Sequence, residues 1–230
     1  MPLDISRIQA ICFDVDGTLS DTDDAWIQRV SNILCTILPW ISKEKIFRFS
    51  RMMIMAAESP ANYIYRLYDW THLDNLLAKL YDSIAHKRSL RRKKNFWIIP
   101  GAQDLLLSLH EKFPLAVVSA RDEISTNSFL EQFQLQDYFQ IIVTAQTCKH
   151  TKPYPDPVIH AAQYMKVAPE NCLMVGDTTV DILSGKRAGM QTIAVLCGFG
   201  REKELQKAGA DLILKTTADL PRIFQIEKDR

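Results

Sequence analysis

Two closely spaced aspartates, Asp14 and Asp16, are followed directly by Gly17 and Thr18. A pair of carboxylates at this spacing can divide nucleophilic attack and proton transfer between them. The glycine permits a sharp turn, so that backbone N–H groups of Gly17 and Thr18 can point at the oxygens of a phosphate group. Paired aspartates before a glycine are also common turn residues, so this stretch alone leaves a catalytic and a structural interpretation open.

Four more reactive side chains follow later in the chain: Ser119, Lys152, Asp177 and Asp181. With the first two aspartates they would form a site of oxygen ligands without a cluster of His or Cys, which suits Mg²⁺ better than zinc. A lysine and a serine beside such an ion supply the positive charge and the hydroxyl donor that a phosphoryl group needs. These residue types indicate phosphoryl chemistry, provided that the fold brings them together.

Short apolar runs, which are typical of buried strands, precede most of these side chains. The runs span residues 8–13, 115–119, 139–143, 172–176, 192–196 and 211–215. From about residue 100 they alternate with helical patterns, which predicts an α/β fold with a doubly wound, largely parallel sheet. Because the carboxyl ends of parallel strands meet at one edge, we expect the reactive side chains to gather there.

Two helices between these strands have recognisable ends. Asp156 before Pro157 predicts an N-cap with proline at the first helical position. Residues 179–188 form a second helical pattern, with Thr178 interpreted as its N-cap. Gly189 directly after this pattern is typical of a left-handed C-cap.

Residues 23–88 differ from the rest of the chain, because they contain helical patterns and no strand-like run. Their apolar residues repeat every three or four positions, which predicts amphipathic helices. We therefore expect an α/β core of residues 1–20 and 96–230 and a four-helix insertion of residues 21–95. The basic run 86–94 is interpreted as a solvated linker, with binding of an anionic partner as the alternative.

The order and spacing of these motifs resemble the haloacid dehalogenase-like (HAD) superfamily. DVDGT looks like its first motif, VVS its second, Lys152 in KPYPDP its third and GDTTVD its fourth. The resemblance covers the whole α/β core, and the insertion after the first motif is similar to the helical cap of the phosphoglycolate-phosphatase-like branch. It implies an enzyme: a magnesium-dependent phosphatase that acts on a small phosphorylated metabolite through an aspartyl-phosphate intermediate.

The resemblance also implies a role for each motif residue. Asp14 would be the nucleophile, and Asp16 would protonate the leaving oxygen and later activate water. Ser119 and Lys152 would hold the transferring phosphoryl group, and Asp177 would bind Mg²⁺ together with Asp14 and the backbone carbonyl of Asp16. An acid at position 16 is the phosphatase pattern, because dehalogenase-type members lack it and phosphonate-cleaving members carry a small residue there.

Three points stay open at this stage. Asp181 would be either a metal ligand through water or a partner of the lysine. A sugar-phosphate mutase of the β-phosphoglucomutase type keeps the same four motifs. A non-catalytic binding or regulatory protein on the same scaffold is the alternative from another class, and intact Asp14, Asp16, Lys152 and Asp177 argue against it.

The composition is that of a globular protein, and it argues against nucleic acid and membrane as partners. The 230 residues include 28 basic and 27 acidic side chains, and this balance argues against a general nucleic-acid binder. No apolar stretch approaches the roughly 20 residues of a membrane span, and the first residues lack the shape of a signal peptide. The five cysteines are scattered and never form a CxxC pair, so we expect a reduced, cytoplasmic setting. The expected partner is a small-molecule phosphate ester, without nucleic acid or membrane.

Overall fold

The structure of the protein is a computed structural model that describes residues 3–21, 31–36, 41–43, 46 and 96–225. The chain divides into two compact units, residues 1–23 with 96–230 and residues 24–95. The helical insertion predicted for 21–95 lies outside the described residues except at 21, 31–36, 41–43 and 46, and the basic run 86–94 lies wholly outside them. All predicted site residues belong to the first unit, which is called the α/β unit below.

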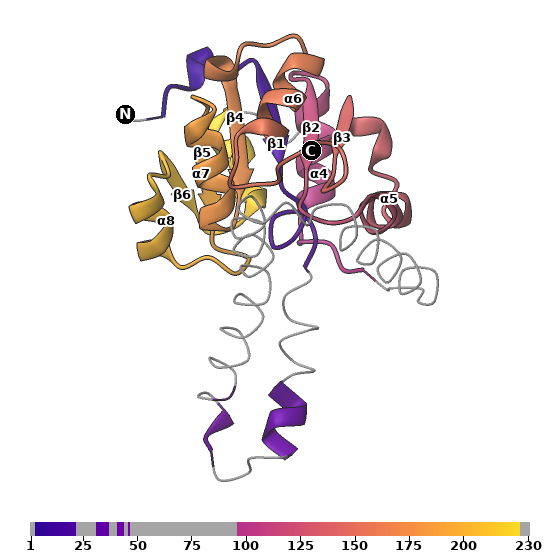
Figure 1. Cartoon of the computed structure of the whole chain (residues 1–230), viewed down its shortest axis with the longest axis vertical. Coiled ribbons are helices and arrows are strands. Elements are labelled where there is room, and N and C mark those ends of the chain that lie inside the picture. Colours follow the sequence, from indigo (N-terminus) through magenta and orange to yellow (C-terminus); the bar gives the residue numbers. More distant parts are fainter. Residues whose placement is uncertain (1–2, 22–30, 37–40, 44–45, 47–95, 226–230) are drawn as a thin grey trace, which may run out of the picture. The chain divides into compact units, whose positions relative to one another are not determined.

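A six-stranded parallel sheet forms the centre of the α/β unit, with the strand order β3-β2-β1-β4-β5-β6 (Figure 1). The strands are β1 (Ala10–Phe13), β2 (Leu115–Val118), β3 (Ile141–Val143), β4 (Cys172–Gly176), β5 (Gln191–Val195) and β6 (Leu212–Leu214). The central strands β1, β2 and β4 are buried along their whole length, as expected for a parallel sheet that is covered on both faces. The predicted doubly wound parallel sheet is confirmed.

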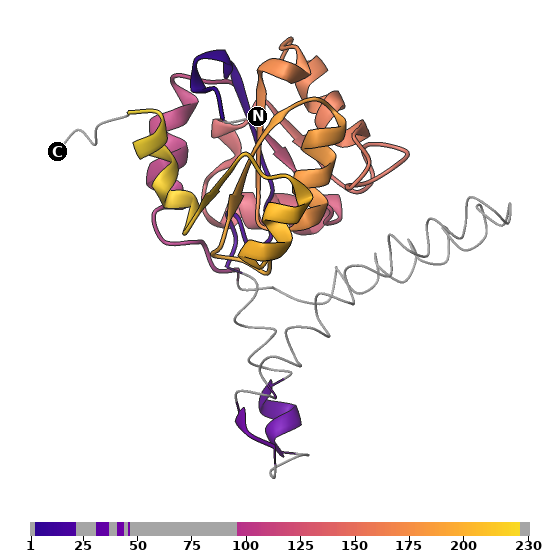
Figure 2. The same cartoon turned by 90° about the vertical axis from the view of Figure 1, so that its left-hand side faces the viewer.

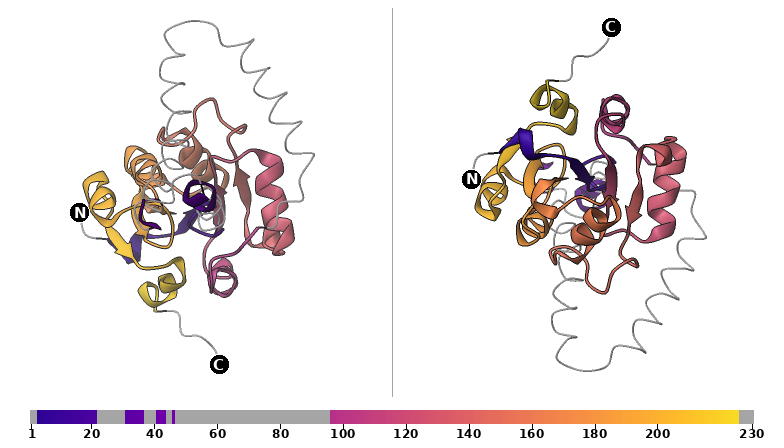
Figure 3. Two further views of the ribbon diagram at one scale, coloured as in Figure 1. Left: turned by 90° about the horizontal axis from the view of Figure 1, so that it is seen from below. Right: turned by 90° about the horizontal axis from the view of Figure 1, so that it is seen from above.

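Helices cover both faces of this sheet. On one face, α4 (Ala102–His110), α5 (Glu123–Gln132) and α9 (Leu220–Ile223) share a core cluster with Ile11 and Phe13 of β1. On the other face, α6 (Asp156–Tyr164) packs with Ala10 and Cys12 of the same strand. Two further helices, α7 (Thr179–Arg187) and α8 (Glu202–Ala208), join β5 in a smaller cluster. Figures 2 and 3 show α4 and α9 on the opposite side of the sheet from α6 and α7.

Short 3₁₀ helices also occur in the described part of the chain. They are η1 (Ile5–Arg7), η2 (Gln136–Tyr138), η3 (Pro169–Asn171) and η4 (Thr217–Asp219). Among the helices of the described residues, none combines the length and the hydropathy of a membrane span.

The two predicted helix ends have different outcomes. The helix α6 already includes Asp156, with Pro155 before it as the cap residue, so the predicted N-cap is wrong by one position. The Asp156 carboxylate lies 3.0 Å from His150 Nδ1, a partner that a local capping pattern does not reveal. At the other helix, Gly189 follows α7 with a φ of 81°, which confirms the predicted left-handed C-cap.

Candidate active site

The carboxyl edge of the sheet brings three predicted site residues together. Asp14 follows β1, Ser119 follows β2, and Asp177 follows β4. Because β1 lies between β2 and β4 in parallel register, the ends of these three strands are neighbours. All three side chains are buried. The convergence therefore results from continuous apolar strands that stop at the same level of the sheet.

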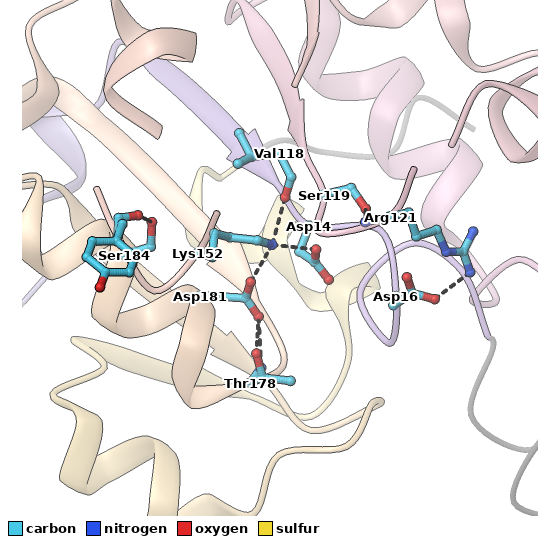
Figure 4. Close-up of polar contacts among 10 residues, drawn as sticks. Asp14, Asp16, Val118, Ser119, Arg121, Lys152, Thr178, Asp181 and Ser184 are labelled. Carbon is cyan, nitrogen blue, oxygen red and sulfur yellow. Dashed lines mark hydrogen bonds and ion pairs between the residues drawn. The ribbon is translucent and has the colours of Figure 1, made fainter. Parts of the chain in front are cut away.

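Lys152 reaches this edge from the loop between β3 and α6. Its Nζ donates to Asp14 Oδ1 and Asp181 Oδ1 at 2.6 Å each and to the carbonyl of Val118 at 2.7 Å (Figure 4). These three acceptors can use all three protons of the ammonium group. Burial alone lowers the pKa of Lys152, but the carboxylates of Asp14 and Asp181 more than offset this and hold the pKa above its ordinary value. Lys152 is therefore a fixed positive charge beside Asp14.

Asp181 connects this lysine to the start of α7. Its Oδ2 accepts hydrogen bonds from the Thr178 N–H at 3.0 Å and from the Thr178 hydroxyl at 2.6 Å. The pair forms a capping box, so the predicted capping role of Thr178 is confirmed. Of the two roles left open for Asp181, the contact with Lys152 is present in the structure. A role of Asp181 as a metal ligand stays a prediction.

Asp177 is held by the loop that follows β5. Its Oδ2 accepts a hydrogen bond from the Phe199 N–H at 2.6 Å. A Cβ on Gly17 would lie 2.3 Å from this oxygen, and a Cβ on Gly198 would lie 2.1 Å from it. Gly17 also has a φ of 72°, in the left-handed region that favours glycine. Both glycines therefore leave the space that the carboxylate occupies, which is a reason for glycine at position 17 beyond the predicted turn.

The backbone groups predicted to face a phosphate have partners within their own turn. The Gly17 N–H donates to the Ser20 carbonyl at 2.8 Å, and the Thr18 N–H lies 3.3 Å from the Val15 carbonyl. The Thr18 side chain is fully buried, and its hydroxyl has no hydrogen-bond partner among the described residues. Phosphate binding by Gly17 and Thr18 stays a prediction.

Three buried carboxylates could hold a cation. Asp14, Asp177 and Asp181 each offer one oxygen, and these oxygens lie within 4.8 Å of one another. Together with Lys152, the ionised group would carry an excess of two negative charges. Burial raises the pKa of Asp14; Lys152 opposes this shift, Asp181 and Asp16 add to it, and the result is about 8. A bound cation would oppose this rise and favour the ionised form of Asp14, and an all-oxygen ligand set suits Mg²⁺.

Asp16 contacts a different cation. Arg121 Nη2 donates to Asp16 Oδ1, in an ion pair that lies beside Asp14 in Figure 4. The side chain of Asp16 is 24% exposed, compared with 8% for Asp14. Arg121 is missing from the predicted site residues. Its place two residues after Ser119, at the same strand end, is the sequence signal that could have identified it.

The chain is similar to several known proteins over most of its length. Pyrophosphatase PpaX of Anoxybacillus flavithermus is 28% identical over 222 residues, which cover 96% of this chain and 98% of the relative. A putative beta-phosphoglucomutase from Thermotoga maritima has a TM-score of 0.63 at 17% identity, covering 95% of this chain and 99% of the other. A predicted phosphoglycolate phosphatase from Haemophilus somnus has a TM-score of 0.62 at 18% identity, with the same coverage. These two solved structures share the fold.

A family model described as haloacid dehalogenase-like hydrolase matches residues 11–195. The match includes the strand ends from Asp14 to Asp177 and the start of α7 with Asp181. It therefore spans every predicted site residue, and the chain belongs to the haloacid dehalogenase-like hydrolase family.

Proposed function

We propose that this chain is a Mg²⁺-dependent phosphomonoester hydrolase that forms an aspartyl-phosphate intermediate on Asp14. The observation that carries the proposal is the buried contact of Lys152 with Asp14 and Asp181, next to Asp177. This group combines a carboxylate, a fixed cation and oxygen ligands, which are the groups that phosphoryl transfer requires. Membership of a hydrolase family supports the same reaction class.

Asp14, Asp177 and the backbone carbonyl of Asp16 would hold Mg²⁺, with Asp181 as a further ligand, directly or through water. The excess of negative charge among the buried carboxylates supports a divalent cation at this place. When bound, the ion would supply positive charge to the phosphoryl oxygens and to Asp14.

In the first half-reaction, an oxygen of Asp14 attacks phosphorus. The bond between phosphorus and the leaving oxygen breaks, and Asp16 gives its proton to that oxygen. In this step Ser119 holds a phosphoryl oxygen, and Lys152 supplies positive charge beside it, since its three protons are donated to Asp14, Asp181 and the Val118 carbonyl. The Ser119 hydroxyl oxygen accepts the Arg121 N–H at 3.1 Å, an arrangement that leaves its own proton for donation to a phosphoryl oxygen.

In the second half-reaction, the ionised Asp16 removes a proton from a water molecule. The water oxygen attacks the phosphorus of the intermediate, and the bond between phosphorus and Asp14 breaks. Free phosphate leaves, Asp14 returns as a carboxylate, and Asp16 carries the proton for the next cycle. One carboxyl group thus serves as acid and then as base.

The proposed substrate is a small phosphate ester, with no nucleic-acid or membrane partner. The relative from Anoxybacillus is named a pyrophosphatase, so inorganic pyrophosphate belongs in the test panel beside phosphoglycolate and sugar phosphates. We propose that the inserted residues 21–95 determine the specificity for one of these substrates. The cytoplasmic setting stays a prediction.

Phosphate release from this panel, measured with Mg²⁺ and with EDTA, tests the proposal. We expect release from at least one compound with Mg²⁺, its loss with EDTA, and its return when Mg²⁺ is added back. The Asp14→Asn variant should release no phosphate under any of these conditions. Full turnover in metal-free buffer would contradict the metal requirement. Isomerisation that needs a bisphosphate primer and releases little phosphate would identify a mutase instead, and inactivity on the whole panel would favour the non-catalytic alternative.

A further inference from the structure

Arg121 occupies a closely packed position between β2 and α5. Its guanidinium carbon lies 5.2 Å from the ring centre of Phe96 and 5.8 Å from that of Phe129. The two rings meet edge to face, with their centres 5.8 Å apart. Only 12% of the arginine side chain is exposed. Aromatic rings attract a cation, and close packing restricts its rotamers, so the guanidinium group is fixed in place.

The residues around Arg121 are themselves anchored. The Phe96 N–H donates to Gln132 Oε1 at 3.2 Å, and the Phe96 carbonyl accepts from Gln132 Nε2 at 2.9 Å. The backbone of Arg121 is held as well, because its N–H donates to Ser119 Oγ at 3.1 Å and its carbonyl accepts from the Ala145 N–H at 3.0 Å. Both the backbone and the charged end of Arg121 therefore have defined positions.

From this position Arg121 reaches the turn that carries Asp16. Its Nη2 donates to Asp16 Oδ1 and lies 3.5 Å from Ser20 Oγ. Figure 4 shows Lys152 on one side of Asp14 and Arg121 with Asp16 on the other. The two cations thus bind different carboxylates: the buried Lys152 binds the proposed nucleophile, and the partly buried Arg121 binds the proposed acid.

We propose that Arg121 is a positioning residue for proton transfer: it binds one carboxyl oxygen of Asp16 and so directs the other oxygen, which carries the proton, toward the leaving oxygen. This role rests on the proposed function, because it requires Asp16 to protonate the leaving group. An aspartate side chain can rotate about two bonds, and a charge-assisted hydrogen bond from a rigid guanidinium removes much of that freedom. A misplacement of about 1 Å in a catalytic group can cost roughly a hundredfold in rate. Arg121 therefore acts on the reaction through Asp16.

The dependence of the rate loss on the leaving group distinguishes a positioning role of Arg121 from a purely structural one. A 4-nitrophenolate ion departs readily without a proton, whereas a phenolate ion departs more slowly and gains from a general acid. Both esters present nearly the same shape to the site, and kcat/KM reports the steps up to departure of the leaving group. We would measure kcat/KM on phenyl phosphate and on 4-nitrophenyl phosphate with Mg²⁺ present. A positioning role predicts a loss that depends on the ester.

The variants are Arg121→Gln, Arg121→Lys and the control Arg222→Gln, which breaks an arginine–aspartate pair with Asp219 at an exposed position. Arg121→Gln should lower kcat/KM for phenyl phosphate by about tenfold to a hundredfold. The loss for 4-nitrophenyl phosphate should stay below about threefold. Arg121→Lys keeps the charge without the planar fork, so its ester-dependent loss should be smaller. Arg222→Gln should resemble the wild-type protein on both esters.

Equal losses on the two esters in Arg121→Gln, with wild-type activity intact, would overturn the positioning role alone. A wild-type protein that hydrolyses neither ester nor any compound of the panel would overturn the proposed function, and the positioning role with it. Melting temperatures show whether each variant is folded. If Arg121→Gln is unfolded at the assay temperature, the comparison is made with Arg121→Lys, because this variant keeps a cation next to Phe96 and Phe129. An equal loss on both esters in that variant would again overturn the role.

Discussion

Replacing Lys152 with methionine tests how the buried charges of the site are balanced. Lys152 donates to Asp14 and Asp181 at 2.6 Å each, and the side chains of all three residues are less than a tenth exposed. Methionine has a similar volume and no charge. The variant therefore keeps the packing, but it leaves these carboxylates close to Asp177 without the cation that holds them together.

The expected loss of stability is large. Removal of one partner from a buried ion pair typically costs about 3–5 kcal/mol, because the remaining charge stays buried. In a domain of roughly 150–250 residues, each kcal/mol shifts the melting temperature by about 2–4 °C. Metal-free Lys152→Met protein should therefore melt roughly 6–20 °C below wild type. Mg²⁺ at about 100 times its Kd should return about 2.7 kcal/mol, since an ion bound only to the folded state stabilises it.

Thermal unfolding in EDTA and in Mg²⁺ measures both effects. The matched control is Lys186→Met, because Lys186 pairs with Asp211 at 2.5 Å outside the site. Asp211 keeps a hydrogen bond from the Thr192 N–H, so we expect this variant to lose only about 1–2 kcal/mol and to respond to Mg²⁺ as wild type does. If Lys152→Met has the same melting temperature as wild type in EDTA, Lys152 does not stabilise the buried carboxylates, and the expected loss of about 3–5 kcal/mol is refuted. At one fixed Mg²⁺ concentration, Lys152→Met should gain more stability than Lys186→Met, because removal of a positive charge next to the site favours the binding of a cation. Equal gains in the two variants would refute the assignment of the metal to this site.

Three further predictions concern the same site. Gly198→Ala should abolish most of the stabilisation by Mg²⁺, because its Cβ would lie 2.1 Å from Asp177 Oδ2; an unchanged Mg²⁺-dependent shift in melting temperature would contradict this. Asp16→Asn should slow both half-reactions, by about 10²–10⁴ on an ester with a poor leaving group, and near wild-type steady-state turnover would show that Asp16 is not the acid and base. In metal-free protein the pKa of Asp14 is about 8 when folded and lies above its unfolded value of 3.8. The folded state then binds more protons, so the contribution of Asp14 to stability is fully present below about pH 4 and is lost as the pH rises toward 8. Urea unfolding in EDTA should show this decline in wild type and a flatter profile in Asp14→Asn; parallel profiles would contradict the raised pKa.

Much of the α/β unit could be predicted from the sequence. Strands that are covered on both faces are continuous apolar runs, and each of the runs ending near Asp14, Ser119 and Asp177 corresponds to a strand within about two residues at its start. Because parallel strands all end at the same edge of the sheet, the strand directions alone predict the edge at which these residues meet. The start of α6 was predicted one residue too late, because the partner of the Asp156 carboxylate is His150 in the preceding loop rather than an amide of the helix.

The pairing of charges at the site could not be predicted from the motifs. Lys152 and Asp14 are 138 positions apart, and Arg121 and Asp16 are 105 positions apart. Which cation meets which carboxylate depends on the paths of the loops after β2 and β3, and no local pattern encodes those paths. The same holds for the Phe199 N–H that binds Asp177. Family membership was predictable because it depends on residue types and their order.

Detection of phosphate on Asp14 is the most direct test of the proposed mechanism. Protein with Mg²⁺ is mixed with a labelled phosphate ester that it hydrolyses, quenched in acid within milliseconds, digested, and examined by peptide mass spectrometry. The account predicts label on the peptide that contains Asp14, its disappearance during a chase with unlabelled ester, and no label in Asp14→Asn. Label on another residue would contradict the role of Asp14 as the nucleophile, and no label while turnover is fast would contradict the covalent mechanism and indicate direct attack by water.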